Sequence, residues 1–364
     1  MFSKSDVVVI GGGAMGLSVG YSLLRKGVKT TILEGSYLNS GSTGRNMGIL
    51  KRRLGSEDLV RLAVKGLELH KKLPSQLGVN TFFRKSGRLL VAKNEEELQQ
   101  LKESHSFYKG LGLKEVWLSP EEIAERWPYI DAGRLVGGYF DPEEAIIHPF
   151  ALTWAYFESI KRLKGMVKKQ NMVKSLQKAA GSFSIITESG VYEAEKIVIA
   201  CGAHSGNLLE QLGFKLKMAF LRKEALVSEP IRPFLDPVIE RPIVSYEVAQ
   251  TMRGEIVGTM GFMSEGYDLS ECTPEFLHNF ASETLQLIPS FRYLRVLRQW
   301  VGICDKTIDS KPLIGSIDEK LYITCGYYDY GMIMAPVVGQ LLAEAIVDGT
   351  CNPLIRPFDP HRFD

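Results

Sequence analysis

Residues 6–34 read DVVVIGGGAMGLSVGYSLLRKGVKTTILE, and this stretch decides the fold. An apolar run at 7–10 meets a glycine turn and a helical pattern, and a second β-type run at 30–33 ends in the acid Glu34. In a dinucleotide site the first glycine permits the tight turn, the second lets backbone approach the pyrophosphate, and the third lets helix and strand pack closely. Glycines alone fit an ordinary turn equally well, so the prediction rests on the flanking strands, helix and acid. The candidate residues are Gly11, Gly13, Ala14, Met15, Gly16 and Glu34.

The loop after Glu34 is rich in glycine and hydroxyl side chains. One interpretation is a flexible surface connection. Because the loop directly follows the acid, we expect it instead to form a second wall of the cofactor site, offering backbone N–H groups and hydroxyls. Its candidate residues are Ser42, Thr43, Arg45, Asn46, Met47 and Gly48.

Composition excludes several classes of protein. The 364 residues leave room for two domains, and a net charge of +2 gives no bulk reason to expect a nucleic-acid partner. Basic clusters such as 51–53 and 168–169 are more typical of solvated faces than of polyanion sites. The five cysteines are scattered without CxxC spacing, which argues against a zinc site or a disulfide framework and for a reducing compartment.

Hydropathy predicts no membrane-spanning segment, because no apolar stretch approaches the 18 or more residues that a spanning helix needs. The apolar N-terminus is broken by three consecutive glycines and has no small-residue cleavage site, so it does not match a secretion signal. We therefore expect a cytoplasmic protein, with any membrane contact made through a partner.

The order of elements predicts an α/β, Rossmann-like βαβ domain interrupted by an α+β domain built on a mostly antiparallel sheet. The run 196–200 ends at Cys201 and Gly202, and the final stretch gives a strand, a turn at 326–331 and a helix. Both return the chain to the cofactor. The predicted cofactor domain comprises 1–84, 145–214 and 301–364, and the predicted substrate domain comprises 85–144 and 215–300.

These features together resemble the D-amino-acid oxidase and sarcosine oxidase family of FAD-dependent amine oxidoreductases. The resemblance covers essentially the whole chain and rests on five blocks in the family's order. They are VVVIGGGAMG…TILE, GSTGRNMG at 41–48, IVIACGAHSGNLL at 197–209, RQWVGICDKTIDSKPLIG at 298–315 and LYITCGYYDYGMIMAPVVGQLLAE at 321–344. NAD dehydrogenases do not carry the last two blocks. Within the family the chain looks most like the β subunits of dye-linked L-proline dehydrogenases and the related glycine and sarcosine oxidases.

The resemblance implies FAD, with its pyrophosphate at the glycine turn, its ribose on Glu34 and its adenine near Val173. Because Cys304 lies off the register of the cysteine that some relatives link covalently to flavin, we expect the FAD to be non-covalent. The resemblance places the flavin against the 42–48 loop and the turn before the last helix. Further cofactor residues implied are Cys201, Gly202, Gly302, Cys304, Gly326, Tyr328, Tyr330, Gly331, Met332 and Ile333. The implied reaction oxidises a C–N bond by hydride transfer to flavin N5, with the protein orienting the substrate.

The chain departs from the family pattern at the substrate. Relatives bind the substrate carboxylate with an arginine where this chain has Cys304, and sarcosine oxidases add a lysine where it has Ile333. We expect the basic trio Lys51, Arg52 and Arg53 to replace them, although plain surface charge explains the trio equally well. The residues expected to position the substrate are Arg52, Tyr330, which replaces a family histidine, and Tyr246 as a cap. Each tyrosine could equally be a core residue.

The stretch 254–262 lacks the lysine that sarcosine oxidases place over the flavin, which favours a dehydrogenase over an oxidase. L-proline is the first substrate expected, with electrons passing to a dye- or quinone-type acceptor or to a partner subunit that carries further electron-transfer cofactors. One alternative is a glycine, sarcosine or D-amino-acid oxidase that uses oxygen and releases peroxide. Another is an FAD-binding assembly subunit without turnover of its own.

Overall fold

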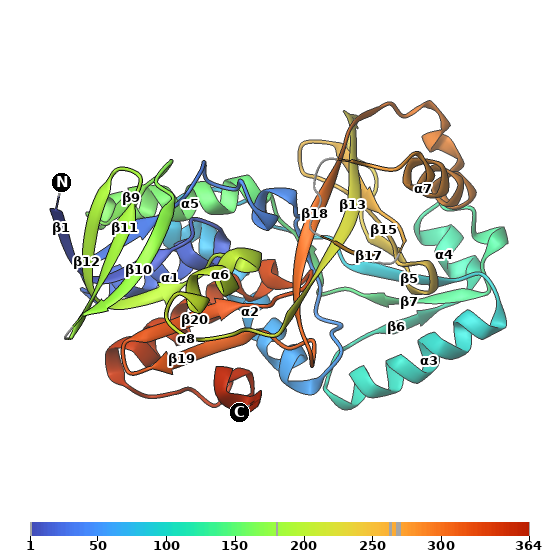
Figure 1. The fold of residues 1–364 in the computed structure, drawn as a ribbon. Helices are drawn as coiled ribbons and strands as arrows, with labels where there is room; N and C mark the ends of the chain where they lie inside the picture. The colour runs from blue at the N-terminus through green and yellow to red at the C-terminus, as the bar shows by residue number, and fades with distance from the viewer. Residues whose placement is uncertain (1, 180, 262–263, 267–270, 364) are drawn as a thin grey trace.

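The computed structural model describes residues 2–179, 181–261, 264–266 and 271–363, which form two sheets with their helices and a small third sheet (Figure 1). The first sheet is mixed, in the order β10-β11-β12-β1-β2-β9, with β20 and then β19 added beside β12. Its strands are β1 (Phe2–Ile10), β2 (Thr30–Leu33), β9 (Met166–Lys168), β10 (Val173–Ala179), β11 (Ser182–Thr187), β12 (Gly190–Ile199), β19 (Leu313–Asp318) and β20 (Leu321–Cys325). The centre of this sheet is parallel: each strand in the run β9, β2, β1, β12, β20 is parallel to the next.

Helices cover this sheet because its parallel strands are apolar on both faces. Residues 7–10 of β1 are each at most 3% exposed. The helices of this half are α1 (Ala14–Arg25), α2 (Glu57–Leu77), α5 (Pro149–Arg162), α6 (Ser205–Glu210) and α8 (Gly331–Asp348). Glycine allows close crossings, since a Cβ on Gly339 of α8 would lie 2.1 Å from Ser18 Oγ of α1.

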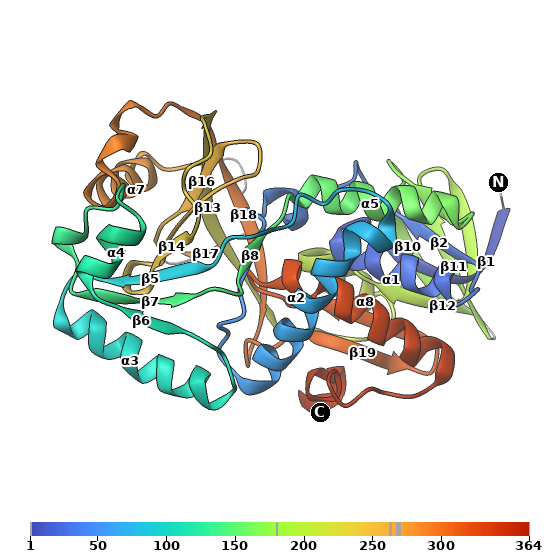
Figure 2. The same cartoon turned by 180° about the vertical axis from the view of Figure 1, so that it is seen from behind.

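Helix α8 corrects one expectation from hydropathy. It is long and apolar enough to cross a membrane by length and composition, contrary to the prediction that no stretch is. Most of the helix is buried, however, and it packs against α1 and α2 in the centre of the first half (Figure 2). This is the behaviour of a core helix.

The second sheet is largely antiparallel, in the order β17-β13-β16-β15-β14-β5-β7-β6, with β18 on the other edge of β13. Its strands are β5 (Arg88–Ala92), β6 (Val116–Leu118), β7 (Gly137–Asp141), β13 (Met218–Pro230), β14 (Val238–Arg241), β15 (Tyr246–Gln250), β16 (Glu255–Thr259), β17 (Ser264–Glu265) and β18 (Val296–Thr307). Helices α3 (Glu95–Gly110), α4 (Pro120–Arg126) and α7 (Pro274–Leu287) flank it. The fold is therefore the expected one, an α/β domain with an interrupting domain on a mostly antiparallel sheet.

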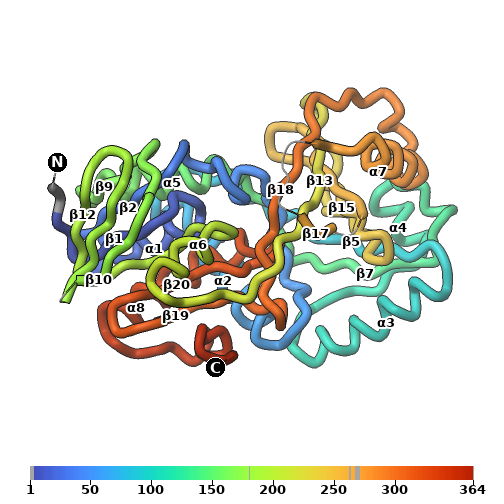
Figure 3. Tube along the Cα trace, in the orientation of Figure 1, coloured from blue at the N-terminus to red at the C-terminus, as the bar shows by residue number. Residues whose placement is uncertain are grey.

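The two halves are joined by short strands and a long ribbon. The small sheet has the strand order β3-β8-β4, in segments where the chain passes between the two halves. Its strands are β3 (Ile49–Leu50), β4 (Arg84–Lys85) and β8 (Ala145–Ile146). The long pair β13 and β18 runs from one half to the other, as the chain trace in Figure 3 shows. Because β18 continues from Val296 to Thr307, this strand crosses the predicted domain boundary at residue 300.

Candidate functional site

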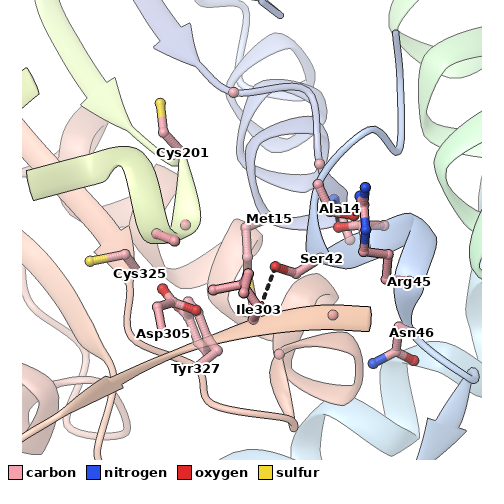
Figure 4. Close-up of a pocket in the computed structure, with 18 of the residues that line it drawn as sticks. Ala14, Met15, Ser42, Arg45, Asn46, Cys201, Ile303, Asp305, Cys325 and Tyr327 are labelled. Carbon is pink, nitrogen blue, oxygen red and sulfur yellow. Dashed lines mark hydrogen bonds between the residues drawn. The ribbon is translucent and has the colours of Figure 1, made fainter. Parts of the chain in front are cut away.

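A cavity of about 600 Å³ lies between the two halves. Its walls come from the turn after β1, the loop after β2, the end of β12, the middle of β13 and β18, and the turn before α8. Figure 4 shows part of this wall, with the end of β12, the start of α1 and β18 around one space. A volume of this size is typical of a small-molecule or cofactor site.

The start of α1 presents bare backbone to the cavity. Gly11 has φ of +114°, and a Cβ there would lie 2.3 Å from Ala200 O. Gly13 is the N-cap of α1 in an extended conformation without a side-chain cap, while Ala14 N donates to Thr43 Oγ1 at 3.1 Å. A helix N-terminus framed by glycines attracts phosphate, so this end suits the pyrophosphate of a dinucleotide.

Glu34 is held rigidly at the end of β2. Its Oε2 accepts from Gly12 N at 2.7 Å and its Oε1 accepts from Ser36 N at 2.8 Å. Val173 lines the same end of the cavity. A fixed carboxylate beside the glycine turn can accept from ribose hydroxyls, so the residues present fit a dinucleotide from pyrophosphate to nucleoside.

The 41–48 loop is fastened to β18, which forms the opposite wall. Ser42 Oγ donates to Ile303 O at 2.7 Å, as drawn in Figure 4. Trp300 Nε1 donates to Arg45 O at 2.9 Å, so Trp300 braces the loop. These two bonds hold the loop as a wall rather than as a mobile surface connection.

Asp305 fixes the turn before α8. Its Oδ2 accepts from Gly326 N at 2.6 Å, and its backbone O accepts from Tyr328 N at 2.8 Å. Gly326 and Tyr328 both have positive φ, +79° and +53°, so the turn depends on this anchor. Burial raises the pKa of Asp305 to about 6. Sequence reasoning did not single out Asp305. The one sequence signal for Asp305 is the alternation along β18. The Asp305 side chain lies in the core, whereas that of the preceding Cys304 is half-buried.

The far end of the cavity is highly charged. Lys51 Nζ lies 2.6 Å from Asp329 Oδ2 and 3.1 Å from Glu247 Oε1. Burial alone would lower the pKa of Lys51, but Asp329 and Glu247 outweigh it and raise that pKa. Burial would likewise raise the pKa of Glu247, but Lys51 and Arg88 outweigh it and lower that pKa. Lys51 is therefore a cation and Glu247 an anion.

Lys223 of β13 brings a second ammonium to the same end. It donates to Ser245 Oγ at 3.0 Å, and within the described part of the chain no carboxylate pairs with it directly. Cys304 lies nearby, and burial, together with Asp329 and Asp305, raises the pKa of its thiol to about 12. This end of the cavity can therefore hold an anionic group against cations, beside an unreactive thiol.

Three residues expected to position the substrate lie elsewhere, which corrects those predictions. Arg52 is 7% exposed and pairs with Asp141, outside the cavity wall. Tyr246 is fully buried in the core of the second half, where its hydroxyl bonds Thr284 Oγ1 at 3.1 Å. Tyr330 is also buried, and its hydroxyl donates to the backbone oxygen of Ser310.

Most of the predicted cofactor residues do line the cavity. They are Gly11, Gly13, Ala14, Met15, Glu34, Ser42, Thr43, Arg45, Asn46, Met47, Val173, Cys201, Gly202, Gly302, Cys304, Tyr328, Gly331 and Met332.

Besides Tyr330, four predicted cofactor residues lie behind the wall instead, three of them glycines. A Cβ on Gly16 would lie 2.0 Å from Gly11 O, so this glycine allows helix and strand to pack. Gly48 has φ of +80°, and its Cβ would lie 2.0 Å from Ile147 O. Gly326 shapes the turn that Asp305 anchors. Ile333 is 1% exposed, and its backbone O lies against Gly66 of α2.

Comparison with known proteins agrees with this geometry. The chain is 28% identical to the sarcosine oxidase subunit beta of Rhodobacter capsulatus, over 99% of this chain and 89% of that protein. The crystal structure of L-proline dehydrogenase from P. horikoshii matches with a TM-score of 0.91 at 28% identity, covering 100% of this chain and 98% of that one. Glycine oxidase from Geobacillus kaustophilus shares the fold, with a TM-score of 0.92 at 22% identity, over 99% of each chain.

The model of one protein family, DAO, described as FAD dependent oxidoreductase, matches residues 6–345. The glycine turn, Glu34 and the turn before α8 all lie within that range and line or shape one cavity. The chain therefore belongs to the DAO family and is an FAD-dependent oxidoreductase.

Proposed function

We propose that this enzyme is a dehydrogenase that oxidises the C–N bond of a small amino acid or secondary amine, with L-proline as the first substrate to test. The observation that carries the proposed substrate class is the far end of the cavity, where Lys51 and Lys223 present two ammonium groups beyond the cofactor walls. The 28% identity with an L-proline dehydrogenase over the whole chain supports the choice of substrate.

The chain's own residues bind and orient the substrate. Bound FAD would supply the acceptor for the hydride equivalent that leaves the carbon next to nitrogen. Lys223 is the better carboxylate ligand, because Asp329 and Glu247 already neutralise Lys51. The Lys51 ammonium, held between these two acids, lines the cavity beside Lys223.

We propose that FAD is held without a covalent bond. The pKa of the Cys304 thiol is raised to about 12, so this thiol stays protonated at neutral pH and is a poor nucleophile. After acid precipitation the flavin should remain in the supernatant, and a yellow pellet would contradict the proposal.

We further propose a dye- or quinone-type acceptor, or a partner subunit, for the electrons. The name of the Rhodobacter relative, a subunit beta, supports a heteromeric assembly. The alternative is an oxidase that acts on glycine, sarcosine or a D-amino acid. The argument for a dehydrogenase is that the stretch 254–262 lacks the lysine that sarcosine oxidases place over the flavin. Lys223 weakens that argument and favours the oxidase, because it supplies a lysine to the cavity wall from another strand.

One experiment tests these proposals together. The yellow protein is mixed anaerobically with D- and L-amino acids and N-methyl amines, and loss of the flavin absorption band is recorded. L-proline should bleach the flavin fastest, and admission of air should yield little peroxide. Rapid peroxide release would favour the oxidase. If no amine bleaches the bound flavin, the turnover proposal fails and an assembly role is favoured.

A further inference from the structure

A basic and aromatic surface lies outside the cavity, on α5 and the segment that follows it. The side chains of Phe150 and Trp154 are 48% and 53% exposed on one face of α5. Both views of the fold place α5 at the outer edge of the first half (Figures 1 and 2). Apolar side chains exposed singly are normal, but a contiguous apolar patch rimmed by polar residues marks a candidate interaction site.

The segment that carries this surface is strongly basic, whereas the rest of the chain has a net negative charge. Residues 150–172 contain five basic residues and one acid, Glu158, for a local net charge of +4. The whole chain has a net charge of +2, so the remainder has a net charge of −2. Glu158, already counted in this sum, faces Lys161 at 3.3 Å, and Glu188, outside the segment, faces Lys174 at 3.7 Å. The excess charge of the segment therefore comes from Arg162, Lys164, Lys168 and Lys169.

Bases and aromatic rings are interleaved in one cluster rather than on separate faces. Lys161 Nζ and Lys169 Nζ lie 5.3 and 5.5 Å from the centre of the Phe157 ring, and the Trp154 ring lies 5.5 Å from the same ring. Lys168 is exposed beside them. Lysine stems can cover apolar groups while their ammonium groups reach phosphates, and tryptophan prefers the boundary between water and acyl chains.

We propose that this surface, defined by Phe150, Trp154, Phe157, Lys161, Lys168 and Lys169, docks the protein on an anionic lipid membrane. The charge draws the surface to acidic headgroups, and the aromatic side chains enter the headgroup boundary. A nucleic acid would use the lysines but give the exposed aromatic face of α5 no apolar partner, so a lipid surface fits both features.

Docking brings the cofactor cavity close to the bilayer. Met172 is the last residue of the basic segment and is 51% exposed. It also lines the cavity beside Glu34. The docked surface therefore adjoins the nucleoside end of the cofactor site, away from the charged end assigned to the substrate.

The test is cosedimentation of the full-length yellow protein with vesicles, which needs no substrate. The protein should sediment with phosphatidylglycerol-containing vesicles at low salt and stay in solution with pure phosphatidylcholine. Reversal of three charges, Lys161→Glu, Lys168→Glu and Lys169→Glu, should weaken binding about tenfold or more. The matched reversal on the other half of the molecule, Lys102→Glu, Lys109→Glu and Lys114→Glu, should leave binding unchanged.

Tryptophan emission tests the apolar contact separately. Vesicles should shift the emission to shorter wavelength, and Trp154→Phe should abolish the shift, whereas Trp117→Phe should keep it. Failure to sediment with either vesicle would overturn the proposal and point to an acidic protein as the occupant. Equal loss of binding in both charge-reversal variants would overturn it as well. Neither outcome bears on the amine oxidation, which is measured without vesicles.

Discussion

Replacing Lys223 with methionine tests how the cavity recognises its substrate. The ammonium of Lys223 donates to Ser245 Oγ at 3.0 Å and lines the far end of the cavity. Within the described residues it has no direct carboxylate partner, so its loss should leave no buried acid unpaired. Lys223→Met should therefore fold normally and lose mainly an interaction with the ligand.

The size of the effect follows from the kind of bond removed. A hydrogen bond to a charged group contributes about 1.5–3 kcal/mol, which corresponds to roughly 10- to 150-fold in affinity. Lys51 cannot compensate fully, because Asp329 and Glu247 hold its ammonium at 2.6 and 3.1 Å. The loss should appear as weaker substrate binding in anaerobic flavin reduction.

A pair of ligands makes the assay specific. L-proline and pyrrolidine share the ring and the amine, but only proline has the carboxylate. Lys223→Met should weaken proline binding by the factor above and leave pyrrolidine binding within about twofold, because pyrrolidine offers no anion to Lys223. Lys217→Met, the same substitution at an exposed position of the segment before β13, is the control.

An equal loss for proline and pyrrolidine would refute the assignment, since it would show a general distortion of the cavity. No loss for either ligand would show that the carboxylate is held elsewhere.

Three further changes test other parts of the site. Glu34→Gln should weaken FAD binding to the apoprotein about tenfold or more, measured by quenching of flavin fluorescence. The substitution removes the charge from the carboxylate that accepts from Gly12 N and that we expect to accept from the ribose hydroxyls. The pKa of Asp305 is raised to about 6 from an ordinary 3.8, so the native state binds this proton more tightly than the unfolded state does. The free energy of unfolding should therefore fall by up to about 3 kcal/mol as pH rises from about 4 to 6. Urea unfolding of Asp305→Asn should lack that fall, and an identical pH dependence in the variant would disprove it. Lys51→Met should lower the free energy of unfolding by about 3 kcal/mol, because Asp329 loses this partner and Glu247, among the described residues, keeps only Arg88 as an ion-pair partner, whereas Lys51→Arg should retain most of the stability.

The cofactor half of the site could be predicted because its signals are local in sequence. The glycine turn, helix and acid lie within 29 residues, and each follows from what one backbone segment must do near a pyrophosphate. The structure places Gly11, Gly13 and Glu34 along one cavity. The missed anchor, Asp305, acts on Gly326 at a separation of 21 residues through the packing of β18 on a turn, which no local pattern reveals.

The basic trio shows why the substrate end could not be predicted in the same way. Lys51, Arg52 and Arg53 are adjacent and chemically similar, yet they point to different places. Lys51 pairs with Asp329, Arg52 with Asp141, and Arg53 with Glu115. These partners lie 278, 89 and 62 residues away, so only the folded chain decides which cation faces the cavity.

The ribbon of β13 and β18 supplies the last part of the explanation. Gly302 stands out in the sequence through its motif, and in the folded chain Lys223 is its direct partner across the two antiparallel strands. Side chains opposite one another in such a pair share one face of the sheet, so a glycine at 302 leaves that face open beside the lysine. A shift of one residue in this register would turn Lys223 to the other face. The charge that we assign to substrate binding therefore depends on the register of a long-range strand pair.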